Sequence, residues 1–474
     1  MILKELIINN FRCFEDFSMT FSPAVNVIVG KNGTGKSALI HAIHHVLSFV
    51  FSNDKSLGDD FLSSGINTLN VRSFDKSDFR YDFAKREYAT SANLSGVADY
   101  GGKELRWSLY KRNSASAALY QSQYKKAFHE FVNQWREQGI PLPLFAYYSD
   151  SYPHRDVKLT QNTLDTIQKD SIPRNFGYYQ WDEDSSCTAI WETRMCNRLF
   201  KQIPLQNQYG KLDGKIKELL MDSDIDSNSK QYAEYNSLVA ERDRIGKLLV
   251  PIMEEINFVT NRLKRFSSLL PHDGDNEWLV DYFMPEQTEG GFQLRIVFEN
   301  GRNYLLQDLP AGYRRVFSMV LDIAYRAYIL NGDEEPSGVD IIDEIDLHLH
   351  PALEQAVLVA LAETFANIQF IVTTHSVSVI SNMETLQGRN QVVALVEGEN
   401  KPRLLPDVFG VDYNSVLRDF MGTPSRNDEL KHLGDRYLLY KENNMEDEAI
   451  SVLEKIKSRV GENSQFVHDL TAKA

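Results

Sequence analysis

The chain has 474 residues, of which 42% are apolar, and its formal net charge is −15. This length and composition predict a globular protein of two to three structural units with a substantial core. The acidic excess excludes indiscriminate attraction to nucleic-acid backbones, so any such contact must be local.

No apolar segment approaches the roughly 20 residues that span a bilayer, and the opening MILKELIINNFRCF lacks the basic start and the cleavage site of a signal peptide. The sequence therefore predicts a cytoplasmic protein without membrane contact. Cys13, Cys187 and Cys196 are odd in number and have no CxxC spacing, so neither a disulfide framework nor a zinc site is indicated.

Short apolar runs over residues 1–29 predict two or three strands that lead into a glycine-rich loop, and a helix is expected from about residue 37 to 50. The loop, GKNGTGKS, satisfies the eight-residue phosphate-loop pattern at all its fixed positions. Its N–H groups would surround phosphate oxygens, and an ordinary glycine-rich turn is the less favoured alternative. Lys36 adds a mobile positive charge, and Ser37 is placed to ligate Mg²⁺. The predicted nucleotide contacts are Asn32, Gly33, Thr34, Gly35, Lys36 and Ser37.

Residues 51–115 are mixed, with LRWSLYKR as the best strand; a helical pattern over 118–137 and an apolar strand in IPLPLFAYYSD follow. From about residue 155 to 270 the chain becomes polar and helical. The heptad-like apolar stripe of this region consists of Tyr235, Leu238, Ile245, Leu249, Ile252, Ile256, Val259 and Leu263. A shorter apolar face lies upstream, and MDSDIDSNS between them predicts the turn of an antiparallel helical hairpin. Projection from the body and packing on the core remain equal alternatives.

Three groups of basic residues are candidates for a local nucleic-acid contact. They are Lys125 with Lys126; Arg194, Arg198 and Lys201; and Arg262, Lys264 and Arg265. A solvated helix face is the favoured interpretation of each group.

Beyond the helical region, Asn300-Gly301 predicts a β-hairpin, and LPAGYRR then precedes a helix over about 313–329. The strand-like runs VDII and IQFIVTT follow, separated by another helix. Strands that alternate with helices predict an α/β fold with a covered parallel sheet. The glycine before the helix offers N–H groups to an anion far from the phosphate loop, which indicates a second half-site.

Polar side chains stand at the carboxyl ends of these two strands. Asp343 is placed to bind magnesium, and Glu344 to polarise the attacking water. His375 ends the next strand, where it would donate a hydrogen bond to a γ-phosphate. His348 and His350 have the H-x-H spacing of a zinc site, but no third soft ligand lies nearby and the metal interpretation is rejected.

Together NNFRCF, GKNGTGKS, LPAGY, IIDEIDLHLHP and TTHS resemble, in order, the motifs of ABC-type ATPase heads of the SMC, RecF and OLD class. The resemblance implies a P-loop head with a mixed sheet lobe, a coiled-coil-like insert and a C-terminal helical tail, and with ATP and Mg²⁺ as cofactors. It adds Arg12 to the nucleotide contacts, places Asp346 in the loop that links two sites, and implies that Ala311 and Gly312 contact the γ-phosphate of a second copy. Pro310 stands where serine is usual, which predicts slow hydrolysis.

The short head, the modest insert and the tail that begins FGVDYNSVLRDFMGTPSR together resemble the PtuA family, the ATPases of Septu anti-phage defence, which also occur beside retrons. That resemblance implies head-to-head dimers, a separately encoded HNH endonuclease of the PtuB type as partner, and nucleic-acid contact through the complex. VVALVEGEN resembles the opening of a TOPRIM nuclease with Glu397 as its acid, but no Asp-x-Asp pair follows. A repair ATPase that acts directly on DNA is the main alternative, and a transport ATPase is less favoured.

The expected segments are 1–150, the first half of the head; 151–290, the helical insert; 291–410, the second half of the head; and 411–474, the helical tail.

Overall fold

The structure is a computed structural model that describes residues 1–52, 69–115, 118–153, 159–181, 186–221, 230–271, 277–288, 291–406, 408–421 and 427–473. The chain forms two compact units, Met1–Phe409 and Gly410–Ala474. Among the described helices, none combines the length and apolar composition of a membrane span.

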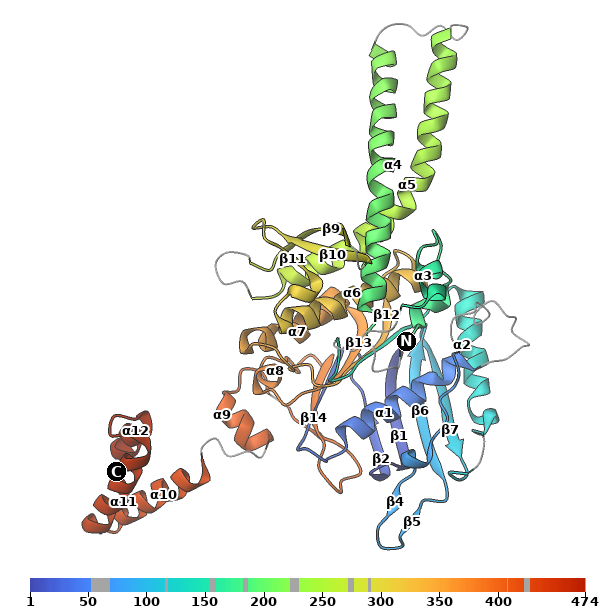
Figure 1. The fold of residues 1–474 in the computed structure, drawn as a ribbon. Coiled ribbons are helices and arrows are strands. Elements are labelled where there is room, and N and C mark those ends of the chain that lie inside the picture. Colours follow the sequence, from blue (N-terminus) through green and yellow to red (C-terminus); the bar gives the residue numbers. More distant parts are fainter. Residues whose placement is uncertain are drawn as a thin grey trace. The chain divides into compact units, whose positions relative to one another are not determined.

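The centre of the first unit is a six-stranded sheet in the order β15-β14-β3-β13-β12-β8 (Figure 1). Its strands are β3 (Val25–Val29), β8 (Leu144–Tyr148), β12 (Ser337–Ile342), β13 (Asn367–Thr373), β14 (Asn390–Ala394) and β15 (Arg403–Leu404). All neighbours are parallel except β14 and β15. Every residue of β3 is buried, as expected for a strand covered on both faces. The predicted covered parallel sheet is confirmed.

An antiparallel sheet in the order β2-β1-β6-β7 forms a second layer. Its strands are β1 (Ile2–Phe11), β2 (Phe14–Thr20), β6 (Ala92–Tyr100) and β7 (Lys103–Lys111). Helix α1 (Lys36–Leu47) packs on this lobe, and Trp107 Nε1 donates to the Val46 carbonyl at 2.8 Å. The lobe therefore supports the helix that follows the glycine-rich loop.

Smaller elements complete the first unit. The short sheets are β4 (Tyr81–Asp82) with β5 (Glu87–Tyr88), and β9 (Val280–Thr288), β10 (Gly291–Phe298) and β11 (Asn303–Leu305). The other head helices are α2 (Lys125–Gln138), α3 (Gln161–Ile167), α6 (Ala311–Asn331), α7 (Pro351–Thr364) and α8 (Val377–Ser381). The short 3₁₀ helices are Ser48–Phe51, Lys76–Asp78, Gln121–Gln123, Arg174–Tyr178 and Leu306–Asp308.

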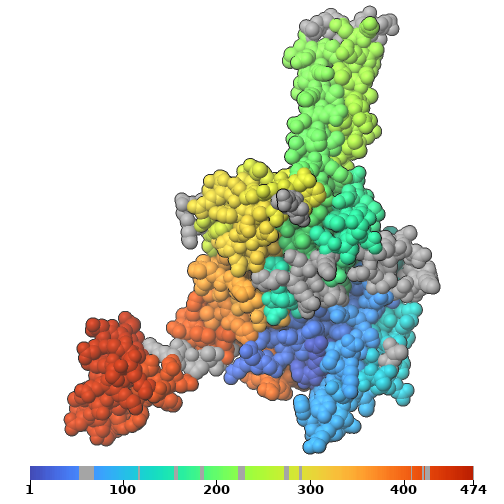
Figure 2. Space-filling view, viewed as in Figure 1, coloured from blue at the N-terminus to red at the C-terminus, as the bar shows by residue number. Residues whose placement is uncertain are grey.

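Two long helices, α4 (Thr188–Met221) and α5 (Lys230–Ser268), form an antiparallel hairpin that projects from the head (Figures 1 and 2). The predicted apolar stripe holds the hairpin together, because Ile245, Leu249 and Ile252 are buried along it. The hairpin thus projects rather than packing on the core. The predicted turn MDSDIDSNS begins at Met221, the last residue of α4, and its remainder, 222–229, lies outside the described residues.

Three arginines in two of the basic groups, Arg194, Arg198 and Arg262, do not lie on a solvated helix face, so that prediction is wrong for them. Arg194 and Arg198 are buried, and both pair with the buried carboxylate of Glu255. Arg262 pairs with Glu335 at 2.6 Å and lies over the Phe258 ring. Burial or pairing therefore engages these three arginines within the protein.

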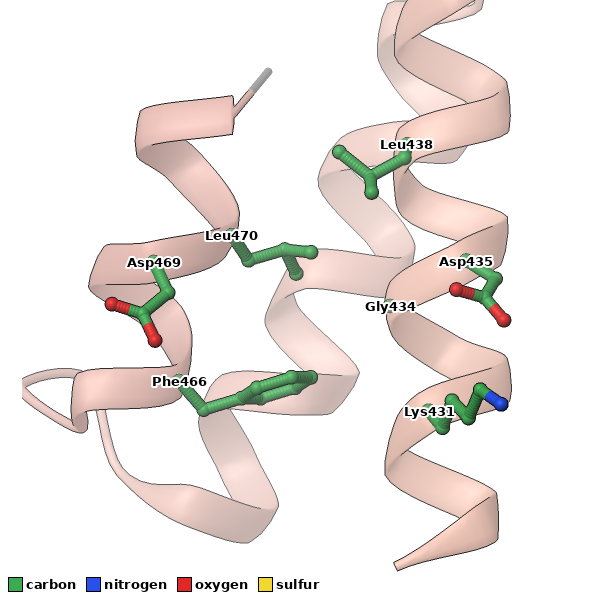
Figure 3. Close-up of a pocket in the computed structure, with 7 residues that line it drawn as sticks. All are labelled: Lys431, Gly434, Asp435, Leu438, Phe466, Asp469 and Leu470. Atoms are coloured by element: carbon green, nitrogen blue, oxygen red, sulfur yellow. The ribbon is translucent and has the colours of Figure 1, made fainter. Parts of the chain in front are cut away.

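The second unit is a small helical bundle with its own core. It contains α9 (Tyr413–Ser415), a π-helical turn (Val416–Phe420), α10 (Asp428–Glu442), α11 (Glu446–Val460) and α12 (Gln465–Lys473). Its buried cluster comprises Leu433, Tyr437, Ala449, Val452, Ile456, Val467 and Leu470. Figure 3 shows Phe466 and Leu470 of α12 turned toward α10, where a cavity of about 120 Å³ lies beside Gly434.

Candidate functional site

The glycine-rich loop joins β3 to α1 and curls over the carboxyl end of the sheet. Lys36 Nζ donates to the carbonyl oxygens of Gly30, at 2.8 Å, and Lys31, at 3.3 Å, so its charge lies over the loop. Thr34 Oγ1 also donates to the Lys31 carbonyl, at 2.9 Å. Burial lowers the pKa of Lys36, and the carboxylates of Asp343 and Glu344 oppose that shift. The lysine is therefore near the two predicted acids.

Gly35 shows why this loop requires glycine. Its φ is +102°, and a Cβ there would lie 2.8 Å from Cys13 Sγ and 2.8 Å from Phe14 Cζ. The turn between β1 and β2 therefore lies directly against the loop. That turn also carries Arg12, whose Nε donates to Asp78 Oδ1 at 3.0 Å and whose N–H donates to the Asp78 carbonyl at 2.8 Å.

Asp343 and Glu344 follow β12, and β13 lies between β12 and β3. Thr373 Oγ1 donates to Asp343 Oδ1, and the Glu344 N–H donates to Thr373 Oγ1 at 2.8 Å. Burial raises the pKa of Asp343, while the Thr373 hydrogen bond and the Lys36 charge lower it. One threonine hydroxyl thus orients both acidic residues, a role that the sequence motifs did not reveal.

Glu344 has a left-handed backbone, with a φ of +50°. This conformation is unfavourable for a residue other than glycine or asparagine, and such residues concentrate at functional sites. Thr373 fixes the Glu344 N–H, while Arg315 Nη2 donates to the Glu344 carbonyl at 3.2 Å. The surrounding contacts therefore hold the predicted base in a strained geometry.

Arg315 is a second functional residue that the motifs did not reveal. It is 1% exposed on α6, and burial lowers its pKa. Its guanidinium donates to the backbone carbonyls of Ser149, Asp150, Tyr152, Asp343 and Glu344. It therefore ties the helix after LPAGY to both acids and to the segment after β8. An arginine directly before the apolar run VFSMVLDIAY was the available signal.

The segment after β13 carries His375, which is half-buried at the carboxyl end of the strand. Asp346 binds this segment: its carboxylate accepts from Thr374 Oγ1 and, at 3.3 Å, from the His375 N–H. Because β13 lies between the strands of the loop and the acids, His375 is central at this edge of the sheet.

Ala311 and Gly312 begin α6, directly after Pro310. A Cβ on Gly312 would lie 2.9 Å from the His348 carbonyl, so the start of α6 touches the loop that follows the acids. Within the described residues, no hydrogen bond joins 311–312 to the glycine-rich loop. In this chain the start of α6 therefore lies against the loop that follows Asp343 and Glu344, and not against the glycine-rich loop.

His348 and His350 have features of the local backbone structure. His348 has a φ of +64°, and His350 Nδ1 accepts from the Ala352 N–H at 3.3 Å at the start of α7. In the described part of the chain, no three His, Cys, Asp or Glu side chains cluster as metal ligands.

A cavity of about 400 Å³ opens beside the glycine-rich loop. Gly33, Thr34, Phe14 and Arg80 line one part of it, and Glu397 lines another. Glu397 follows β14, whose residues pair with β3, so VVALVEGEN belongs to the same sheet as the loop.

The donors at this edge fit a nucleoside triphosphate with Mg²⁺. The hydroxyl of Ser37 and the carboxylate of Asp343 are oxygen ligands, which Mg²⁺ prefers, and the Lys36 ammonium complements phosphate charge.

A family model described as an AAA ATPase domain matches residues 1–380. The chain belongs to this ATPase family. A relative of this AAA ATPase, Retron Vc95 probable ATPase from Vibrio cholerae serotype O1 biovar El Tor, is 25% identical over 397 residues, covering 81% of this chain and 72% of the relative. Septu protein PtuA from Bacillus mycoides (strain KBAB4) is 32% identical over 145 residues, 29% of this chain and 20% of PtuA. These matches confirm the resemblance to retron and Septu ATPases.

Among solved structures, the SMC head bound to the C-winged helix domain of ScpA is similar in fold. The alignment covers 85% of this chain and 98% of the SMC head chain. The two share 12% identity with a TM-score of 0.42, a level of likeness that says nothing about what this chain binds.

Proposed function

We propose that this chain binds and hydrolyses ATP as the regulatory subunit of a bacterial anti-phage defence assembly. One observation carries the ATPase assignment: Lys36, Asp343, Glu344 and His375 meet at the carboxyl end of three adjacent strands. The defence assignment is supported by relatives named as a retron ATPase and a Septu protein.

In the proposed reaction the N–H groups of the loop and Lys36 hold the β- and γ-phosphates. Ser37 and Asp343 would hold Mg²⁺, which supplies a positive charge for the transferred phosphoryl group. Glu344 orients the attacking water and accepts its proton, and its backbone is fixed for that purpose by Thr373 and Arg315. His375 donates to the γ-phosphate, and Arg12 lies beside the loop as a further nucleotide contact. The cavity beside Gly33 accommodates the nucleoside.

We propose that the site is completed by a second copy. Ala311 and Gly312 would contact the nucleotide of the partner copy through the free N–H groups at the start of α6, with Asp346 in the loop between the two sites. The contact of Gly312 with the His348 backbone supports this arrangement, because it joins the trans-acting end to the loop after Glu344. Loss of a hydroxyl at Pro310 predicts slow turnover.

The controlled partner is proposed to be a separately encoded HNH endonuclease of the PtuB type, and nucleic acid would be met through the complex. Incorporation of Val392–Leu395 into the ATPase sheet supports a nuclease on another chain. A repair ATPase that grips DNA directly is less favoured, because Arg194, Arg198 and Arg262 are engaged within the protein.

We propose that the chain divides into segments with different functions. Segments 1–150 and 291–410 are the halves of the ATPase head, 151–290 is the insert, and 411–474 is a helical tail.

Mass measurement of the purified chain with and without ATP and Mg²⁺ tests the proposal. The Glu344→Gln variant should bind ATP, form a dimer and retain it, because the nucleotide is not consumed. A variant that turns over ATP as a monomer at every protein concentration would overturn both the dimer and the role of Glu344.

A further inference from the structure

A cavity of about 500 Å³ lies at the root of the helical hairpin. Both arms contribute to its lining, which comprises Asp170, Arg198, Phe200, Lys201, Pro204, Leu205, Lys247, Leu248, Pro251 and Ile252. Its size is that of a binding pocket, and most of its lining is apolar. Neither the phosphate loop nor the acidic residues contribute to it, so this cavity is separate from the nucleotide site.

Each arm of the hairpin contains a proline at this level. Pro204 lies inside α4 and Pro251 inside α5, and neither has an N–H to donate. The carbonyls four residues earlier, those of Phe200 and Lys247, therefore lack their usual helical donor. Both residues line the cavity.

Large apolar side chains are exposed around the same cavity. Phe200 is 37% exposed and Leu248 is 49% exposed, one on each arm. Ile203, one turn along α4 from Phe200, is 51% exposed. Apolar side chains that converge from two helices on one groove are typical of a docking surface.

The groove is locally basic although the chain is acidic. Three cations, Arg198, Lys201 and Lys247, line the cavity with one carboxylate, Asp170. Lys247 is exposed and makes no salt bridge within the described residues. A net positive rim around an apolar floor complements a segment that is apolar on one face and acidic on the other.

We propose that this groove docks an amphipathic acidic helix of a partner protein. A large apolar side chain of that helix would enter between Phe200 and Leu248, and its carboxylates would pair with Lys247 and Lys201. Donors on the same helix, such as an indole or hydroxyl group, would satisfy the carbonyls freed by the two prolines. The identity of the partner as the controlled nuclease rests on the proposed function, but the chemistry of the groove does not.

The position of the groove connects it to the ATPase. Arg198 lines the cavity and pairs with Glu255, which Arg194 also holds. One turn before Arg194, Trp191 stacks on Tyr325 of α6 at 5.2 Å. Tyr325 lies on α6, the helix that begins at the residues proposed to contact the partner's nucleotide. These contacts therefore connect the groove to that helix. Coupling of this kind acts in both directions.

A synthetic peptide tests the groove without any assumption about the natural partner. The probe is a fluorescent helix of about five turns with leucines on one face and glutamates on the other; its control has lysines in place of the glutamates. With the full-length chain, we expect anisotropy to show at least about tenfold tighter binding of the acidic peptide.

Leu248→Asp and Lys247→Glu should each weaken that binding about tenfold, at an unchanged melting temperature. Phe83→Asp, in the β4–β5 turn where Phe83 is 85% exposed, is the matched control and should bind like the unaltered chain. Three results would overturn the proposed docking site. They are equal affinity for both peptides, unchanged binding by Leu248→Asp, and an equal loss of binding in Phe83→Asp.

The partner is then tested with the proposed HNH nuclease of the PtuB type. A photocrosslinking residue at position 248 should capture the nuclease through an acidic helix. If the peptide binds but no nuclease associates, the groove stands and the proposed partner is wrong. If the nuclease associates equally well with Leu248→Asp, its docking here is wrong while the proposed regulation survives.

Discussion

The nucleotide edge of the head and the root of the hairpin both contain buried arginines, but the two sets differ in their partners. Within the part of the chain that the structure describes, the hydrogen bonds of Arg315 go to backbone carbonyls. Arg194 and Arg198 instead pair with the carboxylate of Glu255, through contacts of 2.6–2.7 Å. In the described residues Arg315 therefore forms no ion pair with the nearby acids, whereas Arg194 and Arg198 share one carboxylate.

This difference distinguishes residues that we propose take part in catalysis from residues that stabilise the fold. At the nucleotide edge, Asp343 and Glu344 are the residues that we propose act on a metal ion and on the attacking water. At the hairpin root, the carboxylate is fully used by its two guanidinium partners. Substitutions at the edge should therefore reduce turnover more than stability, and substitutions at the root should do the reverse.

The largest expected effect is on turnover. Glu344→Gln should lower the rate of phosphate release by about 100- to 10,000-fold, the range of a lost general base, with ATP affinity retained. Glu363→Gln, an exposed position on α7, is the matched control. An active Glu344→Gln variant would show that the strained backbone at this residue serves something other than water activation.

At the hairpin root, Glu255→Gln should lower the free energy of unfolding by about 3–5 kcal/mol, because two buried guanidinium groups lose their counter-charge. Urea unfolding measures this loss, and Glu254→Gln, which is exposed on the same helix, is the control. If Glu255→Gln were as stable as the native chain but inactive, the proposed separation of roles would be wrong.

Lys36→Ala tests the contribution of the nucleotide edge to ATP binding. Removal of a charged donor to phosphate should weaken ATP binding by about 100-fold, the upper range of such a hydrogen bond. Equilibrium titration with a fluorescent ATP analogue measures the change. Lys31→Ala is the control, because Lys31 accepts hydrogen bonds through its backbone carbonyl, which the substitution keeps. Unchanged affinity would remove the loop from the nucleotide site.

Arg315→Lys should have a smaller effect of about tenfold on kcat, with little change in KM, because lysine keeps the charge but loses the planar fork. Arg314→Lys, on the adjacent residue of α6, is the matched control. A rise in KM alone would indicate that Arg315 acts on nucleotide binding rather than on the position of Glu344.

The sequence predicted those features whose residues are contiguous or follow one period. The phosphate loop, the acids after β12, the parallel sheet and the stripe of α5 are of this kind. Thr373 and Arg315 were not predicted as site residues, because their roles arise only when β13 and α6 pack beside β12. The prediction that Arg194 and Arg198 are solvated failed for the same reason, since Glu255 lies 61 and 57 residues further along the chain.

The left-handed backbone of Glu344 has one more consequence. Glycine and asparagine accept such a conformation with less strain than glutamate does. Exchange of this acid for asparagine should therefore give a chain that is inactive yet melts at a higher temperature than the native one. Evolution would then have accepted a less durable molecule in return for a correctly aimed carboxylate.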